Sequence, residues 1–533
     1  MTLSLRTARL AGLVGLAAIA TVVAGCTAEP PIPVPTAGDV SVMPPAVQAI
    51  MDDPAYAGAR WGLSLVDVES GEVLLALNTD QKFQMASTAK ILSVNAALEK
   101  LGADHTIDTP VIATGPIADG TLAGDLVLRG MGDLTLGNGV KPDGTIDVQI
   151  FDHYDANALP GQATLSPIDP LSGLDALAAQ VEAAGVTRIA GDVMVDDRLW
   201  DPFAADGVPI TPIVVNDNLV DFVMTPGAAA GHPVTSTWRP QTAAYRPTFD
   251  VTTGEVGSPI DLDIVPGVGG ALTISGSVPA GASPVVYTYQ VADPATWART
   301  LFIEALGRAG VEVSTDPLSA NPAALPPSAE LDATTPIARY TSPPFSETAR
   351  LINKVSHNLG ANQLPLLLAS QEGKRTLEDG IATEMSVLRK GGLTTDEVTI
   401  TDGQGLPPNH IQPAAFTDYL RYLTTTPTFD TFYDSTPILG VDGSLAKVLE
   451  DGDPAKGKAH AKTGTLVGKD ADGDFVLTTK ALAGYLDAKS GRELAFAIYV
   501  NDVPIPRPVD IGKVALTANT DIGSIASALY SAY

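Results

Sequence analysis

The sequence predicts a mixed α/β protein of the α+β kind, in which a long β-rich insertion of one or two extra domains interrupts a single domain. Helix and strand patterns stand at both ends of the chain, whereas the middle is rich in Gly, Pro, Thr and Val and holds short strand-like runs. Hydrophobic residues make up 45% of the 533 residues, which is enough to bury a large core. We therefore expect both ends of the chain to share one sheet.

Charge and cysteine content exclude several classes of function. The chain has 61 acidic against 32 basic residues and a net charge of −29. This balance disfavours nucleic acid, because a phosphate backbone requires clustered Lys and Arg, and it disfavours an electrostatic patch for anionic lipid. A single cysteine allows neither an intramolecular disulfide nor a zinc site built from cysteine pairs.

Residues 1–25 have the pattern of an export signal. Two arginines precede an uncharged, largely apolar run from Leu10 to Ala28. The run is just long enough to cross a bilayer, so an uncleaved anchor is the alternative. Small residues stand directly before Cys26, and this resembles the lipobox of bacterial lipoproteins, in which the cysteine is acylated and becomes the new N-terminus. Residues 26–45 would then be a Pro-rich, extended tether, with a lipid on Cys26 as the only membrane contact.

Residues 46–104 form the first part of the interrupted domain. The alternation of apolar residues from Arg60 to Asp80 indicates a β-hairpin that turns at Ser70-Gly71. A change of phase indicates either a strand that is buried on both faces or a bulge near Val66. Apolar residues at helical spacing follow from Ser87 to Leu101.

Residues 340–533 form the second part of this domain. The runs Ala481–Leu486 and Leu494–Val500 flank a turn and indicate a second hairpin. A helical pattern from Ile511 to Tyr530 closes the chain.

Residues 105–339 form the insertion, with 221–284 as a candidate third domain. Strand-like runs include 125–129 and 285–289, and two helical patterns cover 174–184 and 297–309. The Pro-rich stretch 317–336 would lead the chain back into the interrupted domain.

Ser87-Thr88-Ala89-Lys90 is the first motif with a chemical interpretation. Positions i and i+3 of a helix lie on one face, so the hydroxyl of Ser87 and the amine of Lys90 can meet. A lysine is a base only when it is neutral, so burial must lower its pKa from about 10.4 towards neutrality.

Two further motifs lie in the second part of the domain. In Ser356-His357-Asn358, a hydroxyl and an amide could face the same cleft. In Lys462-Thr463-Gly464-Thr465, a cation and two hydroxyls suit a substrate carboxylate, and Gly464 lets a substrate backbone approach.

Each motif alone also occurs by chance, so the order of the three motifs along the chain is what makes the pattern specific. Ser444-Leu-Ala-Lys447 also fits the first pattern, but it falls after the second motif and so breaks the order. Ser87, Ser356 and Lys462 follow the order SxxK, SxN, KTG of the penicillin-binding proteins and serine β-lactamases.

The long separation between Ser87 and Ser356 resembles the class C low-molecular-mass penicillin-binding proteins, the D-alanyl-D-alanine carboxypeptidase/endopeptidase family. The resemblance covers roughly residues 50–502. Further matching segments are 124–136, 191–197, 223–227, 401–406, 440–445 and 461–466. Two departures bear on substrate preference: His357 stands where the family commonly has Asp, and the segment 468–480 looks like a longer loop than usual.

The resemblance implies a serine β-lactamase/D,D-peptidase-like catalytic domain and a role for each motif residue. Ser87 would be the nucleophile and Lys90 its base, and Ser356 would relay a proton to the leaving amine. Asn358 would hold the substrate amide, and Lys462 would shape the field. Thr463, Gly464 and Thr465 would bind substrate, with the N–H groups of Ser87 and Thr465 as the oxyanion hole.

The expected function is that of a secreted serine D,D-peptidase that acts on peptidoglycan stem peptides and is acylated by β-lactam antibiotics. It would be lipid-anchored on the outer face of the bacterial cytoplasmic membrane. The alternatives are a Ser-Lys esterase or β-lactamase on the same fold, and an inactive wall-binding lipoprotein. We expect no cofactor and no metal, because the six histidines lack metal-like spacing and the acidic run 470–474 lacks the Gly and Glu of an EF-hand loop.

Overall fold

The computed structural model describes residues 42–533 except 471, 506, 508 and 510. The expected signal segment, Cys26 and most of the expected tether lie outside the described residues. Within the described part of the chain, no helix is both long and apolar enough to span a membrane.

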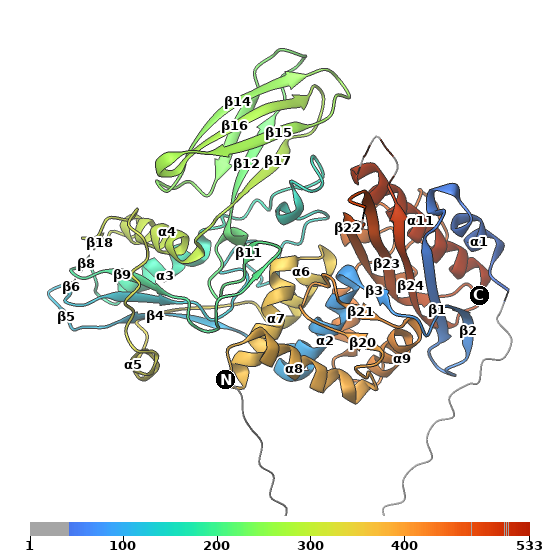
Figure 1. Ribbon diagram of the computed structural model, residues 1–533. Coiled ribbons are helices and arrows are strands. Elements are labelled where there is room, and N and C mark those ends of the chain that lie inside the picture. Colours follow the sequence, from blue (N-terminus) through green and yellow to red (C-terminus); the bar gives the residue numbers. More distant parts are fainter. Residues whose placement is uncertain (1–41, 471, 506, 508, 510) are drawn as a thin grey trace, which may run out of the picture. The chain divides into compact units, whose positions relative to one another are not determined.

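A five-stranded antiparallel sheet joins the two ends of the chain, as the sequence predicts (Figure 1). Its order is β2–β1–β24–β23–β22, so the first hairpin pairs with the last through β1 and β24. A register shift between Leu65 and Val66 confirms the expected bulge. The strands are β1 (Arg60–Asp67), β2 (Val73–Leu77), β22 (Ala459–Lys469), β23 (Phe475–Asp487) and β24 (Glu493–Pro504).

Both faces of this sheet are buried. Along β23 and β24, alternate residues enter two different hydrophobic clusters, as the two-residue period of a strand requires. One cluster includes residues of α11 (Ile511–Ala532), which packs on β23 and against α1 (Pro45–Met51). The other includes residues of α9 (Pro413–Leu423), which packs on β1 and β24.

The central helix of the interrupted domain is α2 (Ala89–Leu101). It begins two residues later than expected, after a 3₁₀ turn at Ala86–Thr88. Ten of its residues are buried, because helices surround it on several sides. Its neighbours are α6 (Phe345–Lys354), α7 (Asn358–Gln371), α8 (Leu377–Leu388) and α10 (Phe429–Ser435), and a small sheet of β3 (Phe83–Gln84), β21 (His410–Ile411) and β20 (Val398–Thr399) lies beside them.

The inserted segment contains several small sheets and two long helices. One sheet is β19 (Ala338–Thr341), β4 (Asp108–Ala113), β7 (Leu126–Arg129) and β9 (Val193–Asp196), and another is β18 (Glu312–Val313), β8 (Arg188–Ile189), β6 (Thr121–Leu122) and β5 (Ile117–Ala118). The helices α3 (Ser172–Ala183) and α4 (Pro294–Arg308) pack on each other, and the Pro-rich segment holds α5 (Ser328–Ala333). β19 crosses the boundary expected at residue 339.

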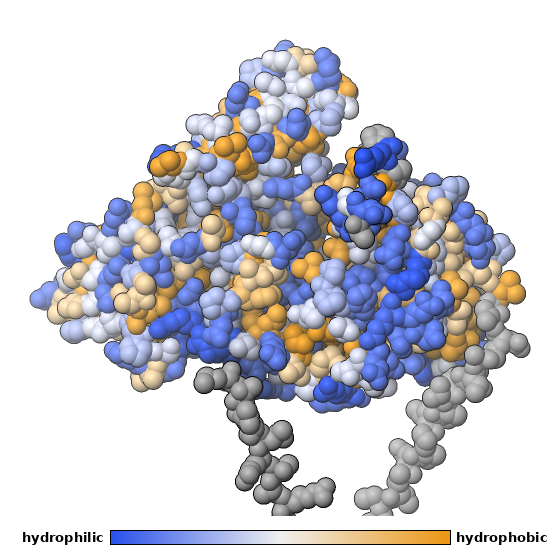
Figure 2. Space-filling model, in the orientation of Figure 1, coloured by the Kyte–Doolittle hydropathy of each residue, from blue (hydrophilic) through white to orange (hydrophobic). Residues whose placement is uncertain are grey.

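Two further sheets occupy residues 219–290. They are β13 (Thr235–Arg239), β12 (Leu219–Thr225) and β17 (Val285–Gln290), then β14 (Arg246–Gly254), β16 (Ala271–Pro279) and β15 (Asp261–Pro266). Figure 2 shows scattered hydrophobic side chains along the second of these sheets. The exposed large apolar residues of this sheet and its connections are Val265 in β15 and, between the strands, Val256 and Val268. The short strands β10 (Ala204–Ala205) and β11 (Val208–Pro209) form a separate hairpin.

The segment expected as a long loop after the third motif is mostly strand. β22 runs on to Lys469 and β23 already begins at Phe475, so the hairpin extends well past the motif. The carboxylate of Asp470 accepts the backbone N–H groups of Asp472 and Asp474 in the tight connection.

Candidate active site

Ser87 and Lys90 meet at the start of α2. Ser87 lies in the 3₁₀ turn and Lys90 in the first turn of the helix, so the side chains share a face. The Lys90 Nζ lies 2.7 Å from the Ser87 Oγ. Lys90 is fully buried, whereas Ser87 is partly exposed and lines the cleft.

The second motif reaches the same amine from the opposite side. Lys90 Nζ donates to Asn358 Oδ1 at 2.7 Å and lies 3.4 Å from Ser356 Oγ. Asn358 is the first residue of α7, and the His357 Nδ1 caps this helix by accepting the backbone N–H of Gly360. Ser356 has a φ of 64°, a left-handed conformation that costs a non-glycine residue energy. The surrounding structure must therefore hold this segment in place.

The third motif lies on β22, the edge strand beside the nucleophile. A Cβ on Gly464 would stand 2.7 Å from the carbonyl oxygen of Met85, so only glycine allows this approach. The Lys462 side chain is fully buried, and its amine donates to the Thr463 carbonyl at 2.8 Å. The hydroxyls of Thr463 and Thr465 line the cleft.

Two residues that the sequence reasoning did not assign to the site contact these hydroxyls. Ser444 Oγ lies 2.8 Å from Thr463 Oγ1, although Ser444 was set aside as a chance match. Lys447 of the same match donates to Gln162 instead, so the pair does not repeat the arrangement of Ser87 and Lys90. The Lys480 Nζ donates to Thr465 Oγ1 at 2.7 Å, because β23 places Lys480 directly opposite Thr465.

Burial lowers the pKa of the three lysines of the site, so each loses its proton more readily than a lysine in water. It lowers the pKa of Lys90 to about 7, against the opposing effect of Asp155 and Asp402. Burial also lowers the pKa of Lys480 to about 7. The pKa of Lys462 falls well below its usual value, through burial first and then repulsion from Lys90 and Lys480. Lys90 can therefore exist as a neutral base near pH 7.

Asp402 supports the site from the loop after β20. Its carboxylate accepts the backbone N–H groups of Gln404 and Gly405 at 2.9 and 2.6 Å, which explains it as a turn residue. Its charge also raises the pKa of Lys90. Asp402 is therefore both a turn residue and a source of negative charge near Lys90.

The insertion contributes Asp155 to the cleft, and no sequence motif marks this residue. It is the last residue of a 3₁₀ turn at His153–Asp155 and lines the same hollow as Ser87. Burial and Asp152 raise the pKa of Asp155 to about 6, while Lys90 and other cations oppose the rise. A carboxylate from the insertion thus interacts electrostatically with Lys90.

Two hollows meet at Ser87. The first, of about 350 Å³, contains Thr463, Lys480 and Asn519, and the second, of about 370 Å³, contains Tyr154, Gln404 and Leu406. Ser87, Asp155, Asn358 and Thr465 line both. A linear substrate could therefore lie across the nucleophile with one part in each hollow.

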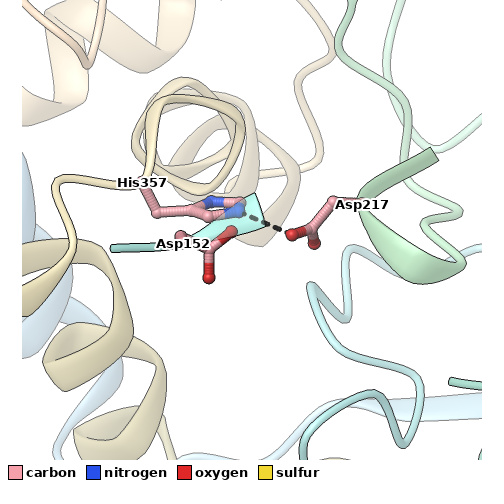
Figure 3. A group of neighbouring side chains, drawn as sticks. All are labelled: Asp152, Asp217 and His357. Atoms are coloured by element: carbon pink, nitrogen blue, oxygen red, sulfur yellow. Dashed lines mark hydrogen bonds and ion pairs between the residues drawn. The ribbon is translucent and has the colours of Figure 1, made fainter. Parts of the chain in front are cut away.

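Asp152, Asp217 and His357 are close enough for a metal ion, with ligand atoms within 4.8 Å of one another (Figure 3). Their hydrogen bonds argue against one. His357 Nδ1 accepts the N–H of Gly360, so the neutral ring carries its proton on Nε2, which faces Asp217 at 3.1 Å. A metal would need that nitrogen deprotonated. His357 is also buried and is not among the residues that line the cleft.

Comparison with known proteins bears on the identity of this site. The D-Ala-D-Ala carboxypeptidase 3 (S13) family matches residues 44–519, which is most of the chain. The chain belongs to the S13 family. It is accordingly a serine-type D-Ala-D-Ala carboxypeptidase, a hydrolase of the class C low-molecular-mass penicillin-binding protein group.

Individual relatives of the S13 family match over nearly their whole length. A D-alanyl-D-alanine carboxypeptidase of an Actinomadura species is 30% identical, over 87% of this chain and 82% of the relative. The carboxypeptidase DacB of Mycolicibacterium smegmatis is 26% identical, over 89% and 86%. The crystal structure of penicillin-binding protein 4 (dacB) of Haemophilus influenzae, complexed with a β-lactam, superposes with a TM-score of 0.63 at 18% identity, over 89% of this chain and 98% of that one. The last comparison shows a shared fold.

Proposed function

We propose that this S13 chain is an exported D,D-peptidase that hydrolyses the D-Ala-D-Ala end of peptidoglycan stem peptides through an acyl-enzyme on Ser87, and that β-lactams acylate the same residue. The observation that carries the proposal is the position of Lys90 Nζ, 2.7 Å from both Ser87 Oγ and Asn358 Oδ1, with a pKa of about 7. The β-lactam complex of the Haemophilus influenzae relative supports the second part.

The proton path follows from these distances. Neutral Lys90 takes the proton of Ser87 as the Oγ attacks the scissile carbonyl. The protonated amine passes a proton to Ser356, 3.4 Å away, and Ser356 gives its own to the leaving amine. The N–H groups of Ser87 and Thr465 would stabilise the oxyanion, by about 3–4 kcal/mol per donor. Water then attacks the acyl-enzyme, with Lys90 again as the base.

The terminal carboxylate of the substrate would bind in the hollow beside β22. The hydroxyls of Thr463 and Thr465 face it, and Gly464 leaves room for the substrate backbone. The amine of Lys480 donates to Thr465 Oγ1 and adds positive charge below its pKa of about 7. The acyl part of the stem peptide would then extend into the second hollow.

The decisive experiment is labelling with a fluorescent penicillin followed by peptide mapping. We expect the label on Ser87 and its complete loss in Ser87→Ala. Ser444→Ala is the matched control: it keeps the label, because Ser444 lacks a lysine partner. A labelled peptide that contains Ser444 would contradict the assignment.

A second assay separates the possible reactions. The protein without residues 1–45 is incubated with pentapeptide stems and with cross-linked muropeptides, and the products are identified by mass spectrometry. Loss of the terminal D-Ala indicates carboxypeptidase activity, and loss of the cross-link indicates endopeptidase activity. Rapid release of the penicilloyl adduct with no peptide cleavage would instead favour a β-lactamase.

A further inference from the structure

A row of buried polar groups connects the insertion to the Ser356-His357-Asn358 motif. Arg239 Nε donates to Asp221 Oδ2 at 3.1 Å, and Asp221 Oδ1 lies 2.7 Å from His153 Nδ1. The other nitrogen of His153 lies 2.9 Å from Asp217 Oδ2, and the same oxygen lies 3.1 Å from His357 Nε2. We call this row the Arg239–His357 chain. The first four residues belong to the insertion and the last to the motif.

The protons of this chain can be assigned from its contacts. Both ring nitrogens of His153 face carboxylates, so both carry protons and the ring is an imidazolium. Burial alone would lower the pKa of His153, but Asp221, Asp152 and Asp217 raise it well above its usual value. His357 keeps one proton, on Nε2, because Gly360 donates to its Nδ1. Asp217 therefore accepts from both rings.

The charges of the chain members themselves cancel, and Asp152, whose carboxylate lies 3.8 Å from His153 Nε2, adds one further negative charge beside them. Arg239 and His153 are positive, and Asp221 and Asp217 are negative. Asp221 is fully buried and His357 is 1% exposed, so an uncompensated charge here would cost several kcal/mol. A buried chain of this kind is fully satisfied only when every member is present.

We propose that the Arg239–His357 chain positions the second motif for acylation, with His357 as the positioning residue through which the insertion acts. The inference rests on the proposed function of Ser87. His357 stands between Ser356, whose backbone is strained, and Asn358, which binds Lys90. The Nδ1 of His357 accepts a hydrogen bond at the start of α7, and its Nε2 holds the ring against Asp217. A ring that loses the contact with Asp217 can turn, and Ser356 and Asn358 on either side of it are then held less firmly. Misplacement by about 1 Å can cost on the order of 100-fold in rate.

Two substitutions at one position separate the two contacts of the ring. His357→Asn keeps an acceptor where Nδ1 stands and can still cap α7, but it is too short to reach Asp217. His357→Gln places an N–H near the position of Nε2 and can still bind Asp217, but it loses the cap. We expect His357→Asn to lower the acylation rate constant for penicillin about 10- to 100-fold, with little change in the dissociation constant of the initial complex. We expect His357→Gln to retain most of the rate.

The insertion side is tested by Asp217→Asn, alone and combined with His357→Asn. Asp217→Asn removes the charge of the acceptor and His357→Asn removes the ring that reaches it, so both weaken the same contact, and the double variant should lose little more than the weaker of the single variants. Asp201→Asn is the matched control: it breaks an exposed ion pair with Arg375, which also joins the insertion to the second part of the domain, and should leave the rate unchanged. The proton NMR spectrum supplies an independent readout. We expect two downfield imidazolium protons from His153 in the parent protein, and loss of one in Asp217→Asn.

Three results would overturn the proposal: equal rates for the Asn and Gln variants of His357, additive losses in the double variant, or a neutral His153. A rate that depends on added zinc or on a chelator would show a metal site at Asp152, Asp217 and His357 instead. If the parent protein is not acylated at all, the proposed function fails, whereas the His153 signals still report on the chain.

Discussion

Lys90 acts as a base only in its neutral form, and burial sets its pKa at about 7. We therefore expect the acylation rate to rise with pH through about 7 and then to level off. Lys90→Arg keeps the charge but removes the base, because a guanidinium does not deprotonate in proteins. Its rate should fall about 10²- to 10⁴-fold. Stopped-flow acylation and circular dichroism measure rate and folding, and a folded variant with near-parental rate would exclude Lys90 as the base.

Asp155, a residue of the insertion, affects the pKa of Lys90. Its charge raises the pKa of Lys90, so Asp155→Asn should lower that pKa and shift the rising limb of the pH profile to lower pH. Asp155 has a pKa of about 6 and is charged where Lys90 titrates. Asp472→Asn, which removes an exposed charge, is the control and should leave the rising limb of the pH profile at the same pH. A limb that moves to higher pH in Asp155→Asn would contradict this account.

Lys480 provides charge beside the hydroxyls that would bind the substrate carboxylate. Lys480→Met should weaken acylation by stem peptides with a free carboxyl end by about tenfold or more, since a charge-assisted hydrogen bond contributes about 1.5–3 kcal/mol. The same peptides ending in an amide should react equally slowly with both proteins. Steady-state hydrolysis rates test this, with Lys374→Met as an exposed control. An equal loss on both substrates would show a structural role only.

The motif residues could be predicted because their order along the chain carries the signal. Asp155, Asp217 and Lys480 could not, because each reaches the site through pairing or packing between distant segments. Lys480 lies opposite Thr465 only in the register that β22 and β23 adopt. Likewise, nothing next to His357 in the sequence indicates that Asp217 will be its partner.

At the scale of elements, the approach of β22 to the 3₁₀ turn at Ala86–Thr88 is set by Gly464. A Cβ there would stand 2.7 Å from the Met85 carbonyl oxygen and 3.3 Å from the Cβ of Ala86. Gly464→Ala should therefore push the strand away from Ser87, costing about 1–3 kcal/mol in unfolding free energy and most of the acylation rate.

The control for this prediction is Gly307→Ala in α4. A Cβ at Gly307 meets nothing within 4 Å, so this change should be neutral or stabilise the protein by about 0.5–1 kcal/mol. Chemical denaturation and acylation kinetics give both quantities. A Gly464→Ala protein with unchanged stability and rate would show that the contact is not tight.

Strong local patterns predicted elements well, and boundaries less well. The bulge at Val66 follows from a change of phase that is visible in the sequence. The extension of β22 and β23 past the motif does not. Beyond Leu466 it consists of three pairs, Val467–Leu477, Gly468–Val476 and Lys469–Phe475, and only Leu477 among them is buried, so no alternating buried face marks these residues as strand. Short strands of the insertion, such as β8 and β18, are held by neighbours and carry little signal of their own.

At the scale of the whole molecule, the expected point of attachment to the membrane is Cys26. We propose that this residue is lipidated and holds the protein at the outer face of the cytoplasmic membrane. Cys26→Ser should then move the protein from the detergent phase to the aqueous phase in a phase-separation assay. If the variant still partitions with membranes, the Leu10–Ala28 run is an uncleaved anchor.

The order β2–β1–β24–β23–β22 also has a consequence for biosynthesis. A ribosome completes β1 early, but its partner β24 is among the last segments made, and β22 is joined to β1 only through β23 and β24. Such distant pairing forms late. A chain that is cut short before β24 has Ser87, Lys90 and the β22–β23 hairpin, but it lacks the strand that joins this hairpin to β1, so we expect such incomplete products to be inactive.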